Sequence, residues 1–370
     1  MKLTIDRVAL LDSLALVQGI ADQRSVVPIL SHVLLEPELD KLKISATNLT
    51  IGIKMEIVAE TIEPAPFTIS ARKLFEIARD CEGEKVSITA LDYNQFQIIC
   101  ERARFKTLGL DLRSFPTMPS LGDKVSGKLT LPATELVTMI DKTIFATYPD
   151  ASRHNLYGVW MGAPVEGTVR MVATDGHRLS MIERDAPGFS METGVIIPRK
   201  GLIELRKLLK QAEESEVQLI VNKQLTWLRH GTTELSTQLV EGEFPDYEAI
   251  LPKQPIYEVH TNNNDLFNAI RRASIFLDGR FYGLKFTFTN NALTIASTNP
   301  DLSESSETLD IIYNGSELST TLNARYVQDV LNVIPDEDEI ILSLNDDTPA
   351  YLITTPSDPR YQYVVMPMKQ

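Results

Sequence analysis

The densest set of chemically active side chains in this chain lies in Ala173-Thr174-Asp175-Gly176-His177-Arg178-Leu179, which brings together a carboxylate, an imidazole and a guanidinium. One interpretation is an enzyme that uses Asp175 and His177 for proton transfer. The other is a strand that ends in an Asp-Gly turn, with His177 and Arg178 shaping a surface. Two more stretches, Ala46-Thr47-Asn48-Leu49 and Ser297-Thr298-Asn299-Pro300, keep the turn but lack His and Arg. A structural turn explains the shared residues, and we favour a binding pocket over catalysis for His177 and Arg178.

Motifs that mark common enzyme classes are missing from the sequence. It contains no G-x-S-x-G, H-E-x-x-H, Walker loop or G-x-G-x-x-G. Asp150, Arg153 and His154 form a second polar cluster, but their spacing defines no mechanism. Cys81 and Cys100 have no metal-ligand spacing and cannot build a disulfide framework. The sequence therefore predicts no catalytic site, no metal, no cofactor and a reducing cytoplasmic location.

The Thr-Asp/Asn turn belongs to a longer pattern that occurs three times, about 126 residues apart, in copies that begin at Leu3, Leu129 and Val259. A second landmark follows the turn in the same order in each copy: Ala71-Arg72-Lys73, Pro198-Arg199-Lys200 and Ala324-Arg325-Tyr326. This period is far above the roughly 20–50 residues of solenoid and propeller repeats. Each copy is therefore expected to be a whole domain.

Length and composition agree with three domains. A chain of 370 residues is too long for one core, whereas a third of it is a usual domain size. We predict domains at 1–125, 127–253 and 255–370. Hydrophobic residues make up 43% and charged residues 23%, as in soluble globular proteins. No window approaches the roughly 18 apolar residues of a membrane span, and no apolar signal region opens the chain.

Each copy reads as two successive units of one strand, one helix and three strands. In the first copy a strand at 3–5 precedes helical spacing from 8 to 20, and strand-like runs follow. Those runs are 29–35, 41–46 and 51–59, and the second unit has strands at 67–69, 86–89, 96–100 and 104–110. Helices are expected at 6–20, 71–81, 132–146, 198–212, 263–277 and 323–334. Six helices among many antiparallel strands predict an α+β fold.

The predicted helices differ in charge from the rest of the chain. The net charge of −14, taken alone, argues against a polyanionic partner. The six helices nevertheless hold 13 Lys/Arg and 9 Asp/Glu, a net of +4, so all other residues carry −18. Solvated helix faces would explain any one helix. Together they favour one helix-lined surface that meets a negative partner, without the signature of a helix-turn-helix or zinc finger.

Four segments, in order along the chain, carry a family resemblance: Val27-Pro28-Ile29-Leu30 after Arg24, Ala173 to Leu179, Phe244-Pro245-Asp246-Tyr247 with Leu251-Pro252, and Tyr363-Val364-Val365-Met366-Pro367-Met368. They resemble the bacterial DNA polymerase III beta subunit family of replicative sliding clamps. The resemblance implies a head-to-tail homodimeric ring of six similar domains, with helices lining the hole and sheets outside. Such a ring needs only diffuse positive potential and phosphate contacts, because topology retains it on duplex DNA.

The resemblance also implies two sets of site residues. DNA would be met by Arg24, Arg72, Lys73, Arg153, Arg199 and Lys200. Short peptides of the polymerase, the clamp loader, and repair and translesion polymerases would dock in an apolar cleft made by Leu156, Thr174, Gly176, His177, Arg178, Leu179, Pro245, Ile250, Val364, Val365, Met366, Pro367 and Met368. We expect Val365 to point inward and Met366 and Met368 to line the cleft. Ala249, where the family commonly has Arg, and Lys369-Gln370, instead of Arg-Leu, depart from the pattern.

The ring joint is expected at two strand edges. By period-two alternation Arg102 and Arg104 share one face of a strand that ends in Phe105. Family positions pair this edge with a group in the third domain: Ile275, Phe276, Asp301, Glu304 and Glu307. Two hypotheses of other classes remain beside the clamp. One is a multi-domain scaffold that binds peptides and never encircles DNA, and the other is the enzyme that uses Asp175 and His177.

Overall fold

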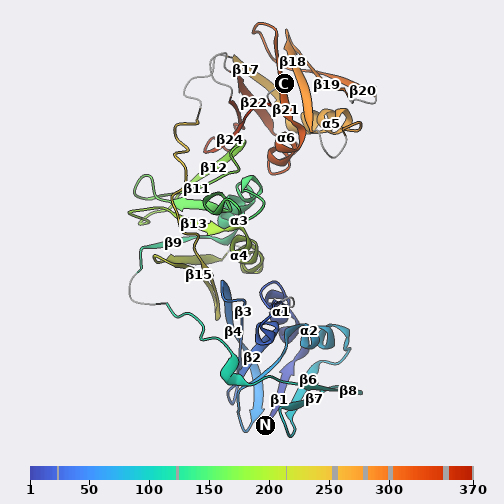
Figure 1. Ribbon diagram of the computed structural model, residues 1–370, viewed down its shortest axis with the longest axis vertical. Helices are drawn as coiled ribbons and strands as arrows, with labels where there is room; N and C mark the ends of the chain where they lie inside the picture. The colour runs from blue at the N-terminus through green and yellow to red at the C-terminus, as the bar shows by residue number, and fades with distance from the viewer. Residues whose placement is uncertain are drawn as a thin grey trace. The chain divides into compact units, whose positions relative to one another are not determined.

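The computed structural model describes residues 1–22, 25–121, 125–213, 215–251, 257–277, 282–298, 303–344 and 350–368. Figure 1 labels the helices and strands along the chain. The chain divides into two compact units, one of residues 1–137 with 200–239 and one of residues 138–199 with 240–370. The division passes through the second predicted domain, so the boundaries near 126 and 254 stay a prediction. None of the described helices is long and apolar enough to cross a membrane.

The predicted unit of strand, helix and three strands occurs six times among the described residues. The first two units are β1 (Lys2–Asp6), α1 (Arg7–Val17), β2 (His32–Pro37), β3 (Lys41–Thr47) and β4 (Ile51–Ile62), then β5 (Phe67–Ser70), α2 (Ala71–Asp80), β6 (Lys85–Ala90), β7 (Gln95–Cys100) and β8 (Ala103–Leu108). The next two are β9 (Gly127–Pro132), α3 (Ala133–Asp141), β10 (Gly158–Gly162), β11 (Thr168–Thr174) and β12 (Arg178–Asp185), then β13 (Val195–Pro198), α4 (Arg199–Ala212), β14 (Glu216–Val221), β15 (Leu225–His230) and β16 (Thr233–Gln238).

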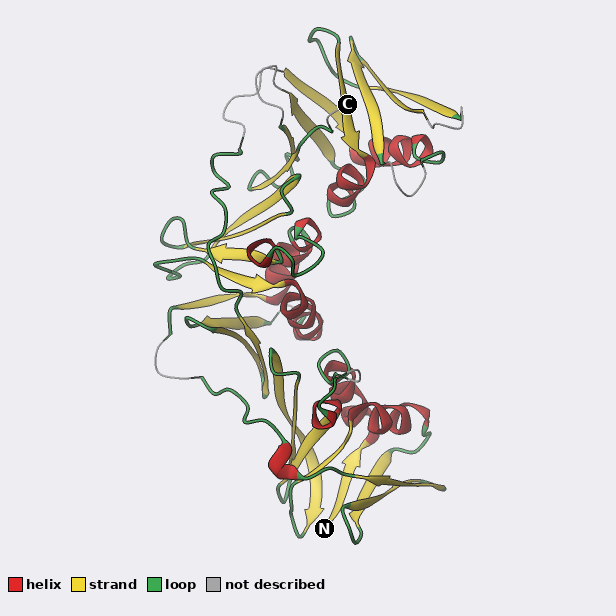
Figure 2. Cartoon of the chain, in the orientation of Figure 1, coloured by secondary structure: helices red, strands yellow, loops and turns green. Residues whose placement is uncertain are grey.

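The third copy repeats the same order. Its elements are β17 (Tyr257–Asn262), α5 (Asn263–Ala273), β18 (Gly283–Thr289), β19 (Ala292–Thr298) and β20 (Glu304–Asp310), then β21 (Leu318–Asn323), α6 (Ala324–Leu331), β22 (Glu339–Leu344), β23 (Tyr351–Thr354) and β24 (Tyr361–Val365). Figure 2 shows these helices and strands by colour. The predicted α+β fold of strand–helix–three-strand units is confirmed.

Several predicted elements have different bounds in the structure, among them the following three. The expected strand from 29 begins only at His32, because Pro28 fixes its φ and opens the 3₁₀ helix η1 (Pro28–Ser31). The expected helix 132–146 ends at Asp141, where the Thr143 hydroxyl donates to the Met139 carbonyl oxygen at 2.7 Å, and η3 (Ile144–Ala146) follows. The strand that carries Arg104 begins at Ala103, so Arg102 lies in the preceding turn and not on the strand.

Each unit is built on antiparallel sheets. In the first unit the strand order is β8-β7-β6-β1-β4-β16-β15-β14-β9, and β2, β3 and β5 branch from β4. In the second unit one sheet runs β13-β10-β11-β12-β24-β23-β22-β17 and the other β20-β19-β18-β21. Two pairings, β4 with β16 and β12 with β24, join strands of successive sequence copies. The sheets therefore continue from one repeat into the next.

Helices bury one face and leave the other charged. In α2 the residues Ala71, Leu74 and Ala78 are buried, while Arg72 and Lys73 are exposed. Helices α1 and α2 pack together in the first unit, and α5 packs with α6 in the second. The Ser70 hydroxyl caps α2, and the side chains of Asp6, Asn262 and Asn323 cap α1, α5 and α6. The first turns of α2, α4 and α6 thus present the exposed cations Arg72, Lys73, Lys200 and Arg325.

Candidate functional site

The Thr-Asp turn between β11 and β12 is held by its own side chains. The Thr174 hydroxyl donates to the Arg178 carbonyl oxygen at 2.6 Å and accepts from the Gly176 N–H at 3.1 Å. Asp175 Oδ1 accepts from the N–H groups of His177 and Arg178, at 2.9 and 3.1 Å. Gly176 has a φ of +90°, in the left-handed region that favours glycine. The segment is a polar turn that aims the His177 side chain outward, where it is exposed.

The first sequence copy contains the same turn. The Thr47 hydroxyl donates to the Ile51 carbonyl oxygen at 2.9 Å and accepts from Leu49 N–H at 3.0 Å, and Asn48 Oδ1 accepts from Ile51 N–H at 2.8 Å. Leu49 takes the place of glycine with a φ of +78°. The recurrence of Thr-Asn/Asp is thus a structural turn, as predicted. The third copy, at Asn299 and Pro300, lies outside the described residues.

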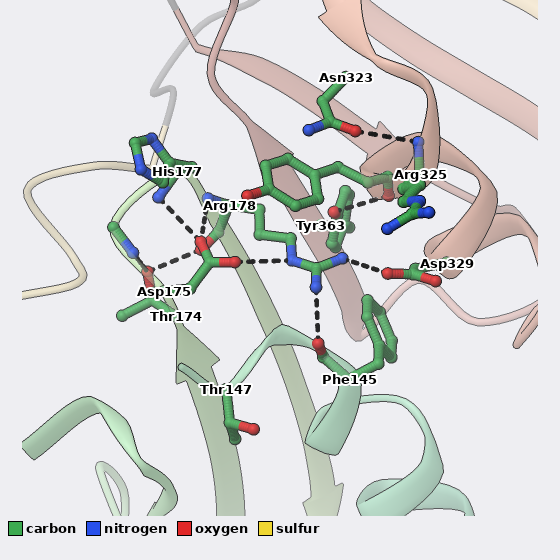
Figure 3. A network of polar contacts seen from close by, with 12 residues as sticks. Phe145, Thr147, Thr174, Asp175, His177, Arg178, Asn323, Arg325, Asp329 and Tyr363 are labelled. Atoms are coloured by element: carbon green, nitrogen blue, oxygen red, sulfur yellow. Dashed lines mark hydrogen bonds and ion pairs between the residues drawn. The ribbon is translucent and has the colours of Figure 1, made fainter. Parts of the chain in front are cut away.

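Arg178 is buried, whereas the turn interpretation expected it on a surface. Its guanidinium donates to Asp175 Oδ2 at 3.0 Å, to Asp329 Oδ2 at 2.5 Å and to the Phe145 carbonyl oxygen at 2.7 Å (Figure 3). It also lies 4.3 Å from the centroid of the Tyr326 ring. Because Asp329 and Tyr326 belong to α6 and Asp175 follows β11, Arg178 ties the second sequence copy to the third. The sequence did not indicate these partners.

Charge around Arg178 is compensated. Burial by itself would lower the pKa of the guanidinium, but the Asp329 and Asp175 carboxylates raise it above its ordinary value. Burial raises the pKa of the Tyr363 hydroxyl well above its usual range. That hydroxyl donates to the Tyr326 carbonyl oxygen at 2.8 Å. Arg178 therefore stays charged and Tyr363 stays neutral throughout the pH range in which proteins work.

The geometry does not make an Asp-His pair for proton transfer. The Asp175 carboxylate accepts from two backbone N–H groups and from Arg178. The His177 ring stacks on the Tyr326 ring, with centroids 6.5 Å apart, and the His177 carbonyl oxygen accepts from Met366 N–H at 2.9 Å. The site therefore offers an exposed aromatic ring beside a fixed turn, which suits recognition of a ligand and not general acid–base chemistry.

Apolar side chains gather beside this turn. The buried members of the cluster are Val172, Leu179, Met181, Tyr247, Ala350 and Val364, and the half-buried residues packed on them are Trp160, Phe244, Ile250, Leu251, Leu352 and Met366. Four predicted cleft residues, Leu179, Ile250, Val364 and Met366, are thus brought together. Strand alternation would have indicated Val172 and Leu352, two residues that the prediction missed.

The other predicted cleft residues occupy different positions. Leu156 and Val365 are buried, the latter fully, as the inward orientation required, and Pro245 and Pro367 are half-buried. Met368 differs from the prediction. Its N–H donates to the Thr321 carbonyl oxygen at 2.8 Å and its side chain packs against Gly283 of β18. Met366 therefore contributes to the apolar cluster, whereas Met368 packs against β18 within its own sequence copy.

The predicted DNA-binding cations are held in unequal ways. Arg72 and Lys73 are exposed and both contact Glu76, at 2.7 and 3.1 Å. Lys200 is exposed at the start of α4. Arg199 is half-buried and donates to Thr147 Oγ1 at 2.9 Å and to a carbonyl oxygen of η3 at 3.2 Å. Arg24 lies outside the described residues.

Arg153 lies beside the Thr-Asp turn. Its guanidinium covers the Tyr148 ring, 5.2 Å from the centroid, and it comes 3.4 Å from the point where a Cβ on Gly176 would stand. Arg153, predicted among the DNA-binding residues, is exposed and lies beside Gly176 of the Thr-Asp turn. Sequence distance concealed this neighbour.

Four of the predicted joint residues, Arg104, Phe105, Glu304 and Glu307, lie on two edge strands. Among the described strands, β8 pairs only with β7, and β20 only with β19. Arg104 and Phe105 are exposed on β8, and Glu304 is exposed at the start of β20. Ile275 and Phe276 are exposed after α5. The remaining joint residues are Glu307, which pairs with Arg272 at 2.6 Å, Arg102, which lies in a turn, and Asp301, which lies outside the described residues.

Three family models cover nearly the whole chain. They describe the N-terminal, central and C-terminal domains of the DNA polymerase III beta subunit, at residues 1–119, 130–246 and 248–369. The chain belongs to the DNA polymerase III beta subunit family. It is a DNA sliding clamp. This accessory subunit of a DNA polymerase is not itself catalytic.

Curated and solved relatives agree with this assignment. The chain is 34% identical to the beta sliding clamp of Caulobacter vibrioides and 33% identical to that of Pseudomonas aeruginosa, with all of both chains covered. It also matches the crystal structure of the DNA polymerase III subunit beta from Pseudomonas aeruginosa with a TM-score of 0.93 at 33% identity, over the full length of both chains. The clamp of Caulobacter crescentus gives the same TM-score and identity.

A half-buried ion network around Asp358 generates a pH prediction for this sliding clamp. Asp358 accepts from Lys142 Nζ at 2.7 Å and from the Arg184 guanidinium at 2.7 and 3.0 Å. Burial would raise the pKa of Asp358, but Arg184 and Lys142 lower it below its usual value. The stabilisation is therefore present above the unfolded-state pKa of about 3.9 and is lost as pH falls through the lower folded-state pKa.

We expect Asp358→Asn to lower the free energy of unfolding at pH 7 by about 1–3 kcal/mol. This is less than the roughly 3–5 kcal/mol for a fully buried pair, because the site is partly exposed. Chemical denaturation at several pH values measures it, with Asp185→Asn, which breaks the exposed pair with Arg360, as control. The difference from the parent should shrink below about pH 4. A difference that is constant down to pH 2 would contradict the assignment.

Proposed function

We propose that two copies of the chain close head to tail into a ring around duplex DNA, and that this ring tethers its partners through the apolar cluster beside His177. The partners are the replicative polymerase, the clamp loader, and repair and translesion polymerases, each through a short peptide. The observation that carries the ring is the repeated strand pairing between sequence copies. The ring acts in the cytoplasm, and it stays on DNA because it encircles the duplex.

Both internal joints use equivalent strands. In each joint, the last strand in the first half of one sequence copy pairs with the last strand in the second half of the next copy. These pairs are β4 with β16 and β12 with β24. Applied once more, the rule assigns β20 a partner equivalent to β16 and β24, and that partner is β8 of another chain. Exposed edges of this kind otherwise favour aggregation. A heterologous contact must close after a fixed number of subunits, here two.

The shared register supports this joint. Gly52 lies opposite Ser236, and Leu179 opposite Val364, each being the fifth residue after the Thr of the turn. In the third copy the fifth residue is Ser303. The hairpins that lead into β16 and β8 begin with the equivalent pairs His230↔Thr233 and Cys100↔Ala103. Ser236 and Lys106 each lie three residues further along, so Lys106 of β8 is the equivalent of Ser236.

Antiparallel counting from this pair then gives the remaining partners across the joint. It places Ser305 opposite Arg104 and brings Glu307 level with Arg102, which lies in the turn just before β8. Opposite charges across strands stabilise the pairing. The apolar side chains of Ile275 and Phe276, exposed in the single chain, would be covered by the partner.

Basic helix starts supply the DNA-facing charge. Arg72, Lys73 and Lys200 are exposed at the first turns of α2 and α4, and they would contact phosphates without reading sequence. Arg24 belongs to this set by family resemblance. The contacts of Arg199 with Thr147 and η3 indicate a second, structural role for this residue. Few strong contacts suit a ring that must slide.

The cluster beside the turn suits short apolar peptides. Ile250 and Met366, packed on the buried Leu179 and Val364, offer a small apolar surface next to the exposed His177 ring. A methionine side chain adapts to varied anchors, which one site for many partners requires. The position of Arg153 beside Gly176 favours a role at the turn over one on DNA. A peptide-binding scaffold without DNA encirclement is not favoured, because the whole chain matches sliding clamps.

The joint is tested by Ile275→Ala with Phe276→Ala, and by Arg104→Glu. Losing two apolar contacts should weaken association by roughly 2–5 kcal/mol, more than an exposed ion pair contributes. Light scattering should shift from about twice 41.4 kDa to the single-chain mass. The same variants should be lost quickly from circular DNA, whereas the parent stays on circles and leaves linear DNA.

Arg113→Glu, at an exposed cation away from the proposed edge, serves as the control for dimerisation. Joint variants that remain dimeric at low micromolar concentration would place the interface elsewhere. A parent that is retained equally on linear and circular DNA would sink the ring.

For DNA contact we expect Arg72→Ala and Lys200→Ala to weaken binding equally across DNA sequences. Each lost phosphate contact should reduce the slope of log K against log salt by about 0.9. Lys128→Ala is the matched control, since Lys128 is exposed on β9, whose alternate residues are buried. Binding measured at several salt concentrations decides the matter. A loss confined to particular DNA sequences would be incompatible with phosphate contacts.

For the cleft we expect deletion of residues 366–370 to weaken partner peptides at least tenfold, about 1.4 kcal/mol. The deletion removes Met366 from the cluster but leaves β24 paired with β12. A chain that lacks only Lys369 and Gln370 is the control. His177→Ala should have a milder effect on affinity and abolish no turnover. Fluorescence polarisation with a labelled peptide from the cognate polymerase measures both, and an unchanged affinity after the longer deletion would refute the cleft.

A further inference from the structure

The segment 244–251 forms one wall of the apolar cluster without belonging to a helix or strand. Phe244, Tyr247, Ile250 and Leu251 all pack in the cluster. Among the described residues, the backbone bond inside this segment is Ile250 N–H to the Tyr247 carbonyl oxygen, at 3.1 Å. A wall with so little backbone pairing depends on its side chains for its position.

Arg170 of β11 connects this segment to the sheet by hydrogen bonds. Its Nε and Nη2 donate to Glu183 Oε2 at 2.9 and 2.8 Å, across the β11–β12 pairing. Its Nη1 donates to the Tyr247 hydroxyl at 3.1 Å and to Glu248 Oε1 at 3.0 Å. The planar guanidinium serves three partners at once, which a lysine ammonium on a flexible stem cannot reproduce.

Tyr247 links Arg170 to the apolar cluster. Its ring is buried, belongs to the same cluster as Leu179 and Val364, and lies 5.4 Å from the Trp160 ring centroid. Burial raises the pKa of the Tyr247 hydroxyl, so the group stays neutral and its oxygen accepts from the guanidinium. The Arg170 carbon Cζ is 5.9 Å from the ring centroid. Arg170 thus fixes both the tip and the face of the ring.

We propose that Arg170 is a positioning residue of the peptide cleft. It sets partner affinity without touching the peptide, because it holds Tyr247 and, through it, the wall that carries Pro245 and Ile250. The inference rests on the proposed cleft beside His177. Arg170 was outside every site assigned from the sequence, since its distance along the chain from Tyr247 conceals their contact.

The test compares two cross-strand Arg–Glu pairs. Arg170→Gln should raise the dissociation constant of a fluorescein-labelled peptide from the cognate polymerase about three- to tenfold. Arg229→Gln removes an equivalent pair, Arg229 with Glu234 at 2.8 Å between β15 and β16, and should leave the peptide affinity unchanged. Arg170→Lys should restore little, because one ammonium cannot keep the three contacts. All variants are measured as full-length dimers.

A double-mutant cycle identifies the path of the effect. Tyr247→Phe removes the hydroxyl and keeps the ring, so it should weaken the peptide by a similar factor. Arg170→Gln combined with Tyr247→Phe should be no weaker than the weaker single variant, since both changes break one contact. Full additivity of the two changes would overturn the proposal.

Acrylamide quenching supplies a readout that does not depend on peptide. Trp227 is fully buried and Trp160 is half-buried, so quencher-accessible emission comes from Trp160 beside Tyr247. Arg170→Gln should increase quenching and Arg229→Gln should not. Ile250→Ala serves as the direct test of the cleft. Weakening by Ile250→Ala without any by Arg170→Gln overturns this inference alone, whereas no weakening by either overturns the cleft as well.

Discussion

Antiparallel pairing between the last strands of successive repeats is the constraint on which this molecule depends. A strand at the end of a sheet leaves N–H and C=O groups that need partners. The chain satisfies them twice internally, β4 with β16 and β12 with β24, and each pairing extends a sheet from one sequence copy into the next. The same requirement applied to β8 and β20 makes self-association a consequence of the repeat.

The joint between the second and third copies and the ligand site share residues. The Thr174–Asp175 turn begins β12, which pairs with β24, and Met366 N–H closes this pairing on the His177 carbonyl oxygen. Arg178 contacts two carboxylates and the Tyr326 ring, which compensate its charge. These partners belong to the second and third copies, so Arg178 connects the two. A buried arginine is stable only when such partners are present. The apolar cluster therefore adjoins the contacts that connect the second and third copies.

Much of the architecture could be predicted because its signals are local. Alternating burial along β9 and the Ser70 cap of α2 follow from neighbouring residues, so the order of strands and helices emerged from pattern alone. The turn was predictable too, since Thr174 and Asp175 bond within four residues of themselves. Two elements have other ends than predicted because a nearby residue favours a different local structure. Pro28 favours a 3₁₀ helix before β2, and the Thr143 hydroxyl bonds to the backbone after α3.

Sequence by itself thus determined the repeats, the α+β fold, the turn and the segments that resemble sliding clamps. Only the tertiary structure decided that Arg178 is buried against Asp329, that Arg153 lies beside Gly176, and that Arg170 holds Tyr247. Local spacing determines which face of a strand or helix a side chain occupies. It does not determine which distant segment packs on that face, because that choice depends on sheet pairing and on the compensation of buried charge across the whole fold.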